Sequence, residues 1–534
     1  MRFNYAGVVP AGTGRVWNSS EAPRTSIIGD YLPYVWIGGP LRGIAVFGES
    51  DRGWVLAEKT HCQEVFREAD GTVVLRLNLV QKPVDLAEPR TIRLGFMATP
   101  VKPMEKGFRS KPIGELVGSC YYWGGYSASD DIHPYDGTDM FWRKMAEARR
   151  TGKVDQPYID RAIAERVCHC PTNSPRHAET YRCMKAHFNS GMNVMANLCG
   201  TETKAVWYTN GRGVRLGNPE GTTFADEWTV EPFAARPFAW GDTKSYSLDP
   251  NRSYLDFAAY WWEKALALGV VDYFYWDDIF CQSNFDLVGT ESYRTASGDI
   301  QPSSGIFNQR AQVKRCAVLQ AEHGWIDHKN WVHMTNTALA PVLSFAGTNY
   351  DWEDVAGDTA IQERYPRECI QAQSLGRQFG NQVAVMGYFA TKDPKSAKLK
   401  WLHRTGVGAV LTHELWWPRV KEWRAADARL TDWGYRQPTT RVWNYWDEDV
   451  PFPVAVTGGE SAALAMRRAD GAAVVVVSDW KDGGDYSIRP VCAAMGIRSD
   501  FTAYDLETGK ALPVADGTVK VTLARFDYVM VGIR

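Results

Sequence analysis

The sequence has no hydrophobic run long enough to cross a membrane, since its longest aliphatic stretch covers only residues 472–477. Its first residues, MRFNY, contain no hydrophobic signal-peptide region. We therefore expect a cytoplasmic protein, or a secreted or periplasmic one whose signal has been removed. The net charge is −2, from 60 basic and 62 acidic residues. Such a balance gives no reason to expect nucleic acid or an anionic membrane surface as a partner.

Several catalytic motifs are also absent. There is no phosphate-binding glycine loop, no G-x-S-x-G turn and no H-E-x-x-H helix. These absences argue against a kinase, an α/β-hydrolase and a zinc protease. The ten cysteines in 534 residues show no spacing typical of a disulfide framework, so we expect mostly buried thiols. We also expect no cofactor.

Aromatic residues, in contrast, are abundant: the chain has 22 tryptophans, and 13% of its residues are Phe, Trp or Tyr. One stretch combines them with acidic residues. Residues 270–276 form a short apolar and aromatic run typical of a buried strand, and Asp277 and Asp278 follow directly. A helix is expected before it, over residues 253–268, ending at Gly269. Helix, glycine, buried strand and carboxylates are the order found in (β/α)-barrel enzymes, where catalytic groups follow the strands.

The rest of the chain predicts three domains. Residues 1–110 alternate like the strands of an antiparallel β-sandwich, and residues 441–534 do so again. Between them, residues 111–440 alternate strands with helices, which predicts a (β/α)₈ TIM-like barrel. The expected barrel strands are 116–123, 192–198, 270–276, 331–334, 347–352, 383–386 and 408–412, with one more assumed within 200–250.

Carboxylates follow several of these strands, often beside an aromatic residue. Cleavage of a glycosidic bond needs two acidic groups on either side of the bond. The catalytic candidates are therefore Asp277, Asp278, Asp351, Glu353 and Glu414. Because neighbours on a strand point to opposite faces, Asp277 and Asp278 share one pocket only if the strand has ended there. Otherwise one of the two faces the pocket, and the other holds the residues that line it.

Aromatic and polar residues at the same strand ends are candidates for binding a sugar. Tryptophan and tyrosine rings stack on sugar rings, and histidine donates hydrogen bonds to hydroxyl groups. A packed core position is the alternative for each of them. The candidates are Tyr122, Trp123, Trp276, His333, Asn336, Tyr350, Trp352, His413, Trp416 and Trp417.

A Cys/His cluster raises the question of a metal. It comprises Cys168, Cys170, His177, Cys183 and His187. Zinc binds such side chains, but this spacing matches no common zinc finger or ribbon. Buried thiols and polar histidines are the alternative, and the sequence leaves the metal open.

Several segments resemble a family of bacterial glycoside-hydrolase-like proteins. The segments are 36–38, 43–45, 49–54 and 95–103 near the N-terminus, and 275–278 and 333–337 in the expected barrel. The resemblance implies a barrel between β-sandwiches. The barrel is also distantly similar to that of retaining β-N-acetylgalactosaminidases, which carry an Asp-Glu pair after the fourth strand. There the Asp orients the acetamido nucleophile and the Glu is the acid. Asp277 matches this Asp, and Asp278, one methylene shorter, stands where the Glu would be.

We therefore expect a glycoside hydrolase that acts on an oligo- or polysaccharide, with Asp277 and Asp278 as the main catalytic residues and a 2-acetamido sugar as one possible substrate. One alternative is a retaining α-glycosidase with Asp277 as nucleophile and Asp351 as acid/base. Another is a carbohydrate-binding protein without activity. The sequence does not specify the sugar, the anomer or the oligomeric state.

Overall fold

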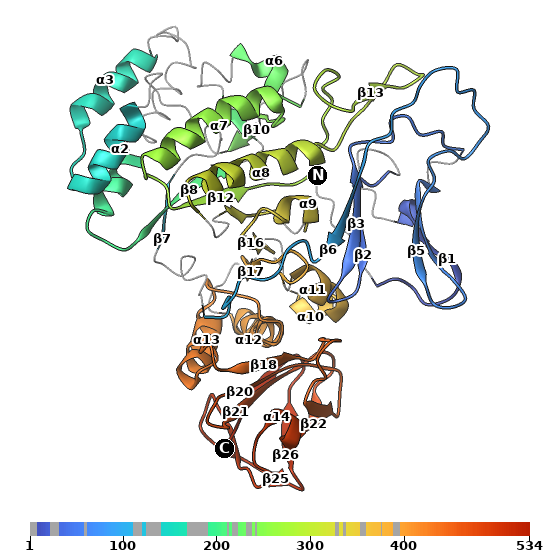
Figure 1. Ribbon diagram of the computed structural model, residues 1–534. Helices are drawn as coiled ribbons and strands as arrows, with labels where there is room; N and C mark the ends of the chain where they lie inside the picture. The colour runs from blue at the N-terminus through green and yellow to red at the C-terminus, as the bar shows by residue number, and fades with distance from the viewer. Residues whose placement is uncertain are drawn as a thin grey trace.

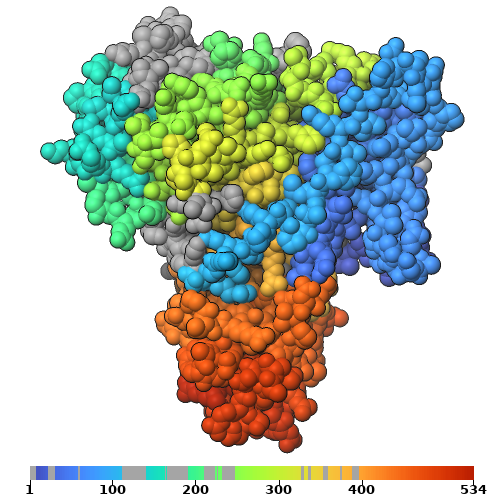
Figure 2. All heavy atoms as spheres, viewed as in Figure 1, coloured from blue at the N-terminus to red at the C-terminus, as the bar shows by residue number. Residues whose placement is uncertain are grey.

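The computed structural model describes residues 8–21, 31–57, 61–110, 120–123, 140–167, 191–210, 213–215, 223–230, 238–240, 243–325, 330–334, 338–352, 359–374, 376–387 and 396–534. Some strand residues, among them 120–123 and 351, are described by their backbone alone. A central α/β region carries the N-terminal strands on one side and the C-terminal strands at its lower end (Figure 1). The same three parts are visible in the space-filling view (Figure 2).

The N-terminal part contains two antiparallel sheets of three strands each. One is β1 (Gly14–Asn18), β4 (Gln63–Arg67) and β5 (Val73–Leu77), and the other is β2 (Tyr34–Gly38), β3 (Gly43–Gly48) and β6 (Leu94–Thr99). The second sheet packs on the central region, because Ala45 and Phe47 belong to the same buried cluster as the central helices. The N-terminal part is therefore joined to the central region by a shared core.

The central sheet has six parallel strands, in the order β17-β16-β15-β12-β8-β7. They are β7 (Cys120–Trp123), β8 (Lys204–Asn210), β12 (Tyr273–Asp277), β15 (Asn330–Val332), β16 (Thr348–Asp351) and β17 (Gln382–Val385). A parallel bridge between Ala384 and Trp416 continues the sheet by one position. The described residues thus account for six strands and this bridge, and the closed eight-stranded barrel stays a prediction.

Helices alternate with these strands. They are α2 (Met140–Thr151), α3 (Gln156–Val167), α6 (Ala225–Trp228), α7 (Arg252–Ala267), α8 (Ile306–Glu322), α9 (Ala340–Leu343), α10 (Ile361–Arg364), α11 (Arg367–Ser374), α12 (Ala397–Thr412) and α13 (Lys421–Trp433). Small strands lie between them: β9 (Gly213–Arg215), β10 (Phe238–Trp240), β11 (Thr243–Ser247), β13 (Tyr293–Arg294) and β14 (Ile300–Gln301). The helix expected before the acidic pair is α7: the Asn251 side chain accepts from the Tyr254 amide at its start, and Gly269, at φ +66°, follows its end.

Two of the expected strands are wrong. Residues 191–197 are helical, and Met192, Val194, Met195 and Leu198 are buried, which is a helical spacing. Residues 408–412 are the last turns of α12 and are apolar all round because the helix is covered on both sides. The strand sought within 200–250 is β8. Among the described strands of the central sheet, β12 is therefore the third along the chain, and not the fourth.

The C-terminal part has one sheet of six strands and one of four. The larger follows the order β18 (Arg441–Asn444), β20 (Ser461–Arg467), β21 (Ala473–Asp479), β27 (Tyr528–Ile533), β23 (Ala503–Asp505) and β24 (Ala511–Leu512). The smaller follows the order β19 (Val454–Thr457), β22 (Gly484–Pro490), β26 (Thr518–Leu523) and β25 (Val514–Ala515), and a short helix, α14 (Cys492–Met495), follows β22. Every residue of β21 is buried, because α12 covers one face of its sheet and the smaller sheet contributes to the core on the other.

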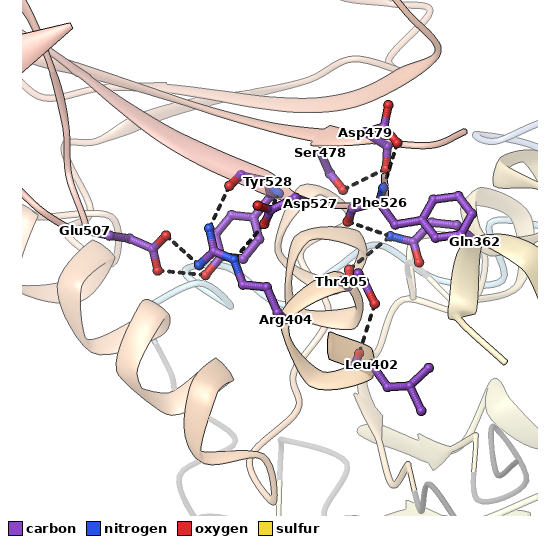
Figure 3. Close-up of polar contacts among 10 residues, drawn as sticks. All are labelled: Gln362, Leu402, Arg404, Thr405, Ser478, Asp479, Glu507, Phe526, Asp527 and Tyr528. Carbon is purple, nitrogen blue, oxygen red and sulfur yellow. Dashed lines mark hydrogen bonds and ion pairs between the residues drawn. The ribbon is translucent and has the colours of Figure 1, made fainter. Parts of the chain in front are cut away.

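Helix α12 fixes the C-terminal part to the central region (Figure 3). Arg404 donates to Asp527 at 2.7 Å, to Glu507 at 2.6 Å and to the Tyr528 carbonyl at 2.8 Å. Gly408 lies so close to the sheet that a Cβ there would be 2.7 Å from the Tyr528 Cβ and 2.8 Å from the Ser478 hydroxyl. Because this glycine has no side chain, the backbone of α12 can pack directly against the sheet at this position.

Two buried carboxylates hold the start of α8. Glu49, from the N-terminal part, accepts from the Gly305 amide at 2.6 Å and the Phe307 amide at 2.7 Å. Asp249, just before α7, accepts from the Asn308 side chain at 2.8 Å. These contacts satisfy backbone and side-chain donors at the N-terminus of α8.

Residues 100–110, here called the strap, run towards the C-terminal part (Figure 2). Two hydrogen bonds place the strap at the amino edge of the central sheet. Lys102 donates to the carbonyl of Ala346, just before β16, at 2.6 Å. Gln382, the first residue of β17, donates to the carbonyl of Phe108 at 2.6 Å. The strap therefore marks the amino edge, opposite the edge where Asp277 lies.

Candidate active site

The position of Asp277 follows from the pairing of β12. This strand lies between β8 and β15, and Tyr275 is paired in register with Tyr208 and Trp331. Side chains alternate along a strand, so Tyr275 and Asp277 share one face. We call this the inner face, and it also carries Tyr208. Asp277 is the last residue of β12, at the carboxyl edge of the sheet.

Two side chains donate hydrogen bonds to the Asp277 carboxylate. The Tyr208 hydroxyl, on the neighbouring strand, donates to Oδ2. Nδ1 of His333, which follows β15, lies 2.7 Å from Oδ1. The Asp277 side chain is 18% exposed, so it is accessible from the carboxyl edge. A carboxylate that is held by two donors and still open to solvent is well placed to act on a ligand.

The same contacts set the protonation of Asp277. Burial raises the pKa of this carboxyl, but the hydrogen bond and charge of His333, together with the hydroxyl of Tyr208 and the Asp278 amide, outweigh burial and lower it. Asp277 is therefore an anion at neutral pH. A permanent anion serves as a nucleophile or as an orienting group, whereas a general acid needs a raised pKa.

Aromatic rings form the floor beneath Asp277. The rings of Tyr208 and Tyr275 stack at 5.2 Å and 16°, and Tyr350 meets Tyr275 edge-on at 6.0 Å. The Tyr275 hydroxyl lies 3.1 Å from Nδ1 of His333. Sequence reasoning missed Tyr208 because β8 had not been located, and it did not count Tyr275 among the site residues although its strand was predicted. The short apolar and aromatic run 205–208 is the signal that could have located this strand and Tyr208.

Asp278 follows with a backbone unlike that of the strand. Its φ is +55°, in the left-handed region, and it is buried. The amide of Ile279 then donates to the carbonyl of His333 at 3.0 Å, which fixes the start of the loop. The strand has thus ended after Asp277, which is the condition under which both carboxylates can serve one pocket.

Trp276 is a core residue and does not form a sugar platform. Its side chain is fully buried on the face opposite Asp277, where it meets Trp262 of α7 edge-on at 5.3 Å. Its indole N–H donates to Asn330 at 3.0 Å. The reason is strand alternation, which places Trp276 against the helices when Asp277 faces inward. Trp417, also fully buried, is a core residue as well.

His413 and Glu414 lie at the other edge of the sheet, and Trp416 lies within the sheet beside Ala384, which corrects their expected position. They were expected after a strand at 408–412, but that segment is helical and the bridge residue is Trp416. His413 and Glu414 therefore precede the sheet position and lie at its amino edge, beside the strap. Burial lowers the pKa of His413 to about 4, and its Nδ1 lies 2.7 Å from the Ala409 carbonyl.

A small pocket opens at this amino edge, lined by Met104, Phe108, Arg377, Gln382, Val383, His413, Glu414, Trp416 and Trp446. Glu414 is engaged by Arg109 of the strap through two hydrogen bonds, one of 2.7 Å, and by the Tyr435 hydroxyl at 2.9 Å. Burial raises the pKa of Glu414, but Arg109 and Tyr435 outweigh it and lower the value to about 2. A carboxylate locked in this way holds the strap in place and is unsuited to proton transfer.

Tyr350 and Trp352 follow the central sheet at β16. Tyr350 is buried, and its ring lies 6.3 Å from that of His333, so it belongs to the surroundings of Asp277. The φ of Trp352 is +67°, and its ring packs on Tyr365 at 4.7 Å. Glu353, Asn336 and the Cys168/Cys170/His177/Cys183/His187 cluster lie outside the described residues, and the side chains of Tyr122, Trp123 and Asp351 are not described.

Two further findings concern the described residues as a whole. No three of their His, Cys, Asp or Glu side chains converge where a metal ion could bind. No helix among them has the length and apolar character needed to cross a membrane.

Comparison with protein-family models gives no match, and comparison with curated proteins gives none either. Solved structures that resemble the chain include glycoside hydrolases. A noncanonic maltogenic alpha-amylase from Thermotoga neapolitana is 9% identical, with a TM-score of 0.36 over 67% of this chain and 80% of that one. A GH27 β-L-arabinopyranosidase from Geobacillus stearothermophilus is 11% identical, with a TM-score of 0.38 over 68% and 78%. A GH36 alpha-galactosidase from the same organism is 12% identical, with a TM-score of 0.36 over 64% and 46%.

Proposed function

We propose that the chain is a glycoside hydrolase in which Asp277 acts as an ionised carboxylate. Glycosidic cleavage uses two acidic groups, one that gives a proton to the leaving oxygen and one that stabilises or attacks the sugar. Asp277 has the properties of the second group. The observation that supports this is the pair of donors, Tyr208 and His333, on a carboxylate that is still open at the carboxyl edge of a parallel sheet.

The proton donor has to be a different residue. Asp278 is a candidate because it follows directly and leaves the strand in a left-handed turn. Asp351, the last residue of β16, and Glu353 are candidates by position along the chain. Glu414 is not one, because Arg109 and Tyr435 hold it at the opposite edge.

Asp277 fits two mechanisms. In the first, it orients a 2-acetamido group, which itself attacks the anomeric carbon. In the second, Asp277 attacks the anomeric carbon directly and forms a covalent glycosyl-enzyme, with Asp351 as acid/base. In both mechanisms Asp277 is ionised, and the two differ in whether a covalent bond forms between Asp277 and the sugar.

A panel of aryl glycosides in both anomers, with and without a 2-acetamido group, tests the proposal. We expect hydrolysis of at least one class, and Asp277→Asn should lower kcat/KM on the order of 10³-fold. The matched control is Asp272→Asn at the other end of the same strand. Asp272 pairs with Arg149 at 2.6 Å and accepts from the Ala205 amide at 2.7 Å, so it serves the fold.

The outcomes separate the alternatives. Equal loss in both variants would show a folding defect and not a catalytic role. Glycan binding without hydrolysis, unchanged in Asp277→Asn, would identify a binding protein and contradict the proposal. Mass spectrometry after incubation with a slow 2-fluoro glycoside distinguishes the two mechanisms, since an adduct on the peptide that contains Asp277 requires direct attack.

A further inference from the structure

Both groups that hold Asp277 are in contact with one deeper residue, Tyr275. Its ring stacks on Tyr208 at 5.2 Å, and its hydroxyl lies 3.1 Å from Nδ1 of His333. Tyr275 itself is only 3% exposed and lies two residues before Asp277 on the same face of β12. It therefore lies one layer below the carboxylate, where it supports the two donors and does not face the solvent.

The chemistry of Nδ1 makes this contact specific. An ionised carboxylate only accepts hydrogen bonds, so the Nδ1 that lies 2.7 Å from Asp277 carries the proton. The Tyr275 oxygen then lies beside the same N–H as a second acceptor. A flipped imidazole would present a carbon to both oxygens. The Tyr275 hydroxyl thus favours the ring orientation in which the Nδ1–H faces Asp277.

We propose that Tyr275 is a positioning residue that acts on Asp277 through His333 and Tyr208. This deepens the proposed function and rests on it. In this arrangement the hydroxyl fixes the imidazole, the ring fixes the neighbouring phenol, and Asp277 is held as an anion with a defined direction. Tyr275 touches no substrate, so its effect falls on the chemical step and its pH dependence, and not on binding.

The variant that tests this is Tyr275→Phe, which removes one oxygen and keeps the ring that stacks on Tyr208. The matched control is Tyr273→Phe, on the same strand and the same face but two residues further from Asp277. For Tyr275→Phe we expect a fall in kcat at nearly constant KM. We also expect the acid limb of kcat/KM to move up by roughly half a pH unit, because an imidazole that is held less firmly in this orientation stabilises the anion less. Tyr273→Phe should leave both unchanged.

A second readout does not need activity. A proton shared between Nδ1 and a carboxylate gives a low-field proton resonance, and His333→Gln and Asp277→Asn identify it by its loss. We expect Tyr275→Phe to shift or broaden this resonance and Tyr273→Phe to leave it in place. If no glycoside is cleaved but the resonance responds in this way, the proposed function fails and the positioning role stands. An unchanged resonance and an unchanged acid limb in Tyr275→Phe, with only a lower Tm, would overturn the inference.

Discussion

Tyr208 and Asp277 stand on neighbouring parallel strands, and the hydroxyl of the first donates to the carboxylate of the second. The two residues are 69 positions apart in the chain, so the pair exists only because β8 and β12 lie side by side. The strongest prediction about the site concerns this bond.

Removing the hydroxyl in Tyr208→Phe should raise the pKa of Asp277, because one donor to the anion is lost while burial still acts. We expect kcat/KM to fall on the order of tenfold at acidic pH and less at neutral pH. A pH profile of kcat/KM measures this. An identical acid limb in the variant and the wild type would show that the hydroxyl does not stabilise the anion.

Asp249 should make the protein less stable as the pH rises. This side chain is 1% exposed, and burial, with the charges of Glu49 and Asp286, raises its pKa from 3.8 to about 7. The folded state then holds a proton that the unfolded state has released, so the contribution is complete below about pH 4 and is lost as the pH rises through 7.

Asp249→Asn should therefore be more stable than the wild type at pH 8, by on the order of 2–4 kcal/mol, and nearly equal to it at pH 4. An amide oxygen still accepts from Asn308, so the substitution removes the charge and keeps this hydrogen bond. Thermal unfolding at the two pH values checks this. A variant less stable than the wild type at pH 8 would show that the carboxylate is favourable in its ionised form.

Glu414 should behave as a structural residue with the opposite pH dependence. Its pKa falls from 4.5 in the unfolded chain to about 2, so its contribution is present above pH 4.5 and is lost as the pH falls towards 2. Glu414→Gln leaves the charge of Arg109 without its partner, and we expect a loss of about 3 kcal/mol in stability. Turnover by the folded variant should stay near that of the wild type. Lost turnover with unchanged Tm would return Glu414 to the catalytic candidates.

Gly408→Ala should weaken the docking of the C-terminal part. Alanine is more favourable than glycine in a helix by about 1 kcal/mol, so helix propensity alone predicts a gain in stability. The added Cβ, however, would lie 2.7 Å from the Tyr528 Cβ, and overpacking costs about 1–3 kcal/mol. We expect a net loss of stability in chemical denaturation. A more stable variant would show that the sheet can move away from α12 without cost.

The sequence predicted elements that are long and have one clear period. The helix expected over 253–268 is α7, and the strand before Asp277 is β12, because apolar spacing and Gly269 define both. The short runs at 192–198 and 408–412 were assigned to strands in error. The run at 408–412 fits either structure, because α12 is covered by the C-terminal sheet, which local sequence does not reveal. At 192–198 the exposed Asn193 and Asn197 lie four residues apart, a helical spacing that the strand assignment overlooked.

The sequence predicted those features of the site that depend on residues close together in the chain. Asp277 at the end of a buried strand is a local feature, and the structure places it at the carboxyl edge of a parallel sheet. His333 was expected at such a strand end, and it lies beside Asp277. Tyr208 comes from a strand that was not located, and nothing near it in the chain points to Asp277. Glu414 was expected at the wrong edge, because the position of one short strand decides on which edge its neighbours lie.

The position of α12 between two sheets also has a consequence for synthesis. This helix leaves the ribosome more than a hundred residues before β27, which supplies Tyr528 and part of the surface that covers it. Synthesis proceeds at about 5–20 residues per second, so the apolar side of α12 stays exposed for on the order of 6–25 s before β27 can pack on it. Depletion of chaperones that bind nascent apolar segments should therefore lower the yield of soluble protein, and a ribosome stall placed before β27 should lower it further.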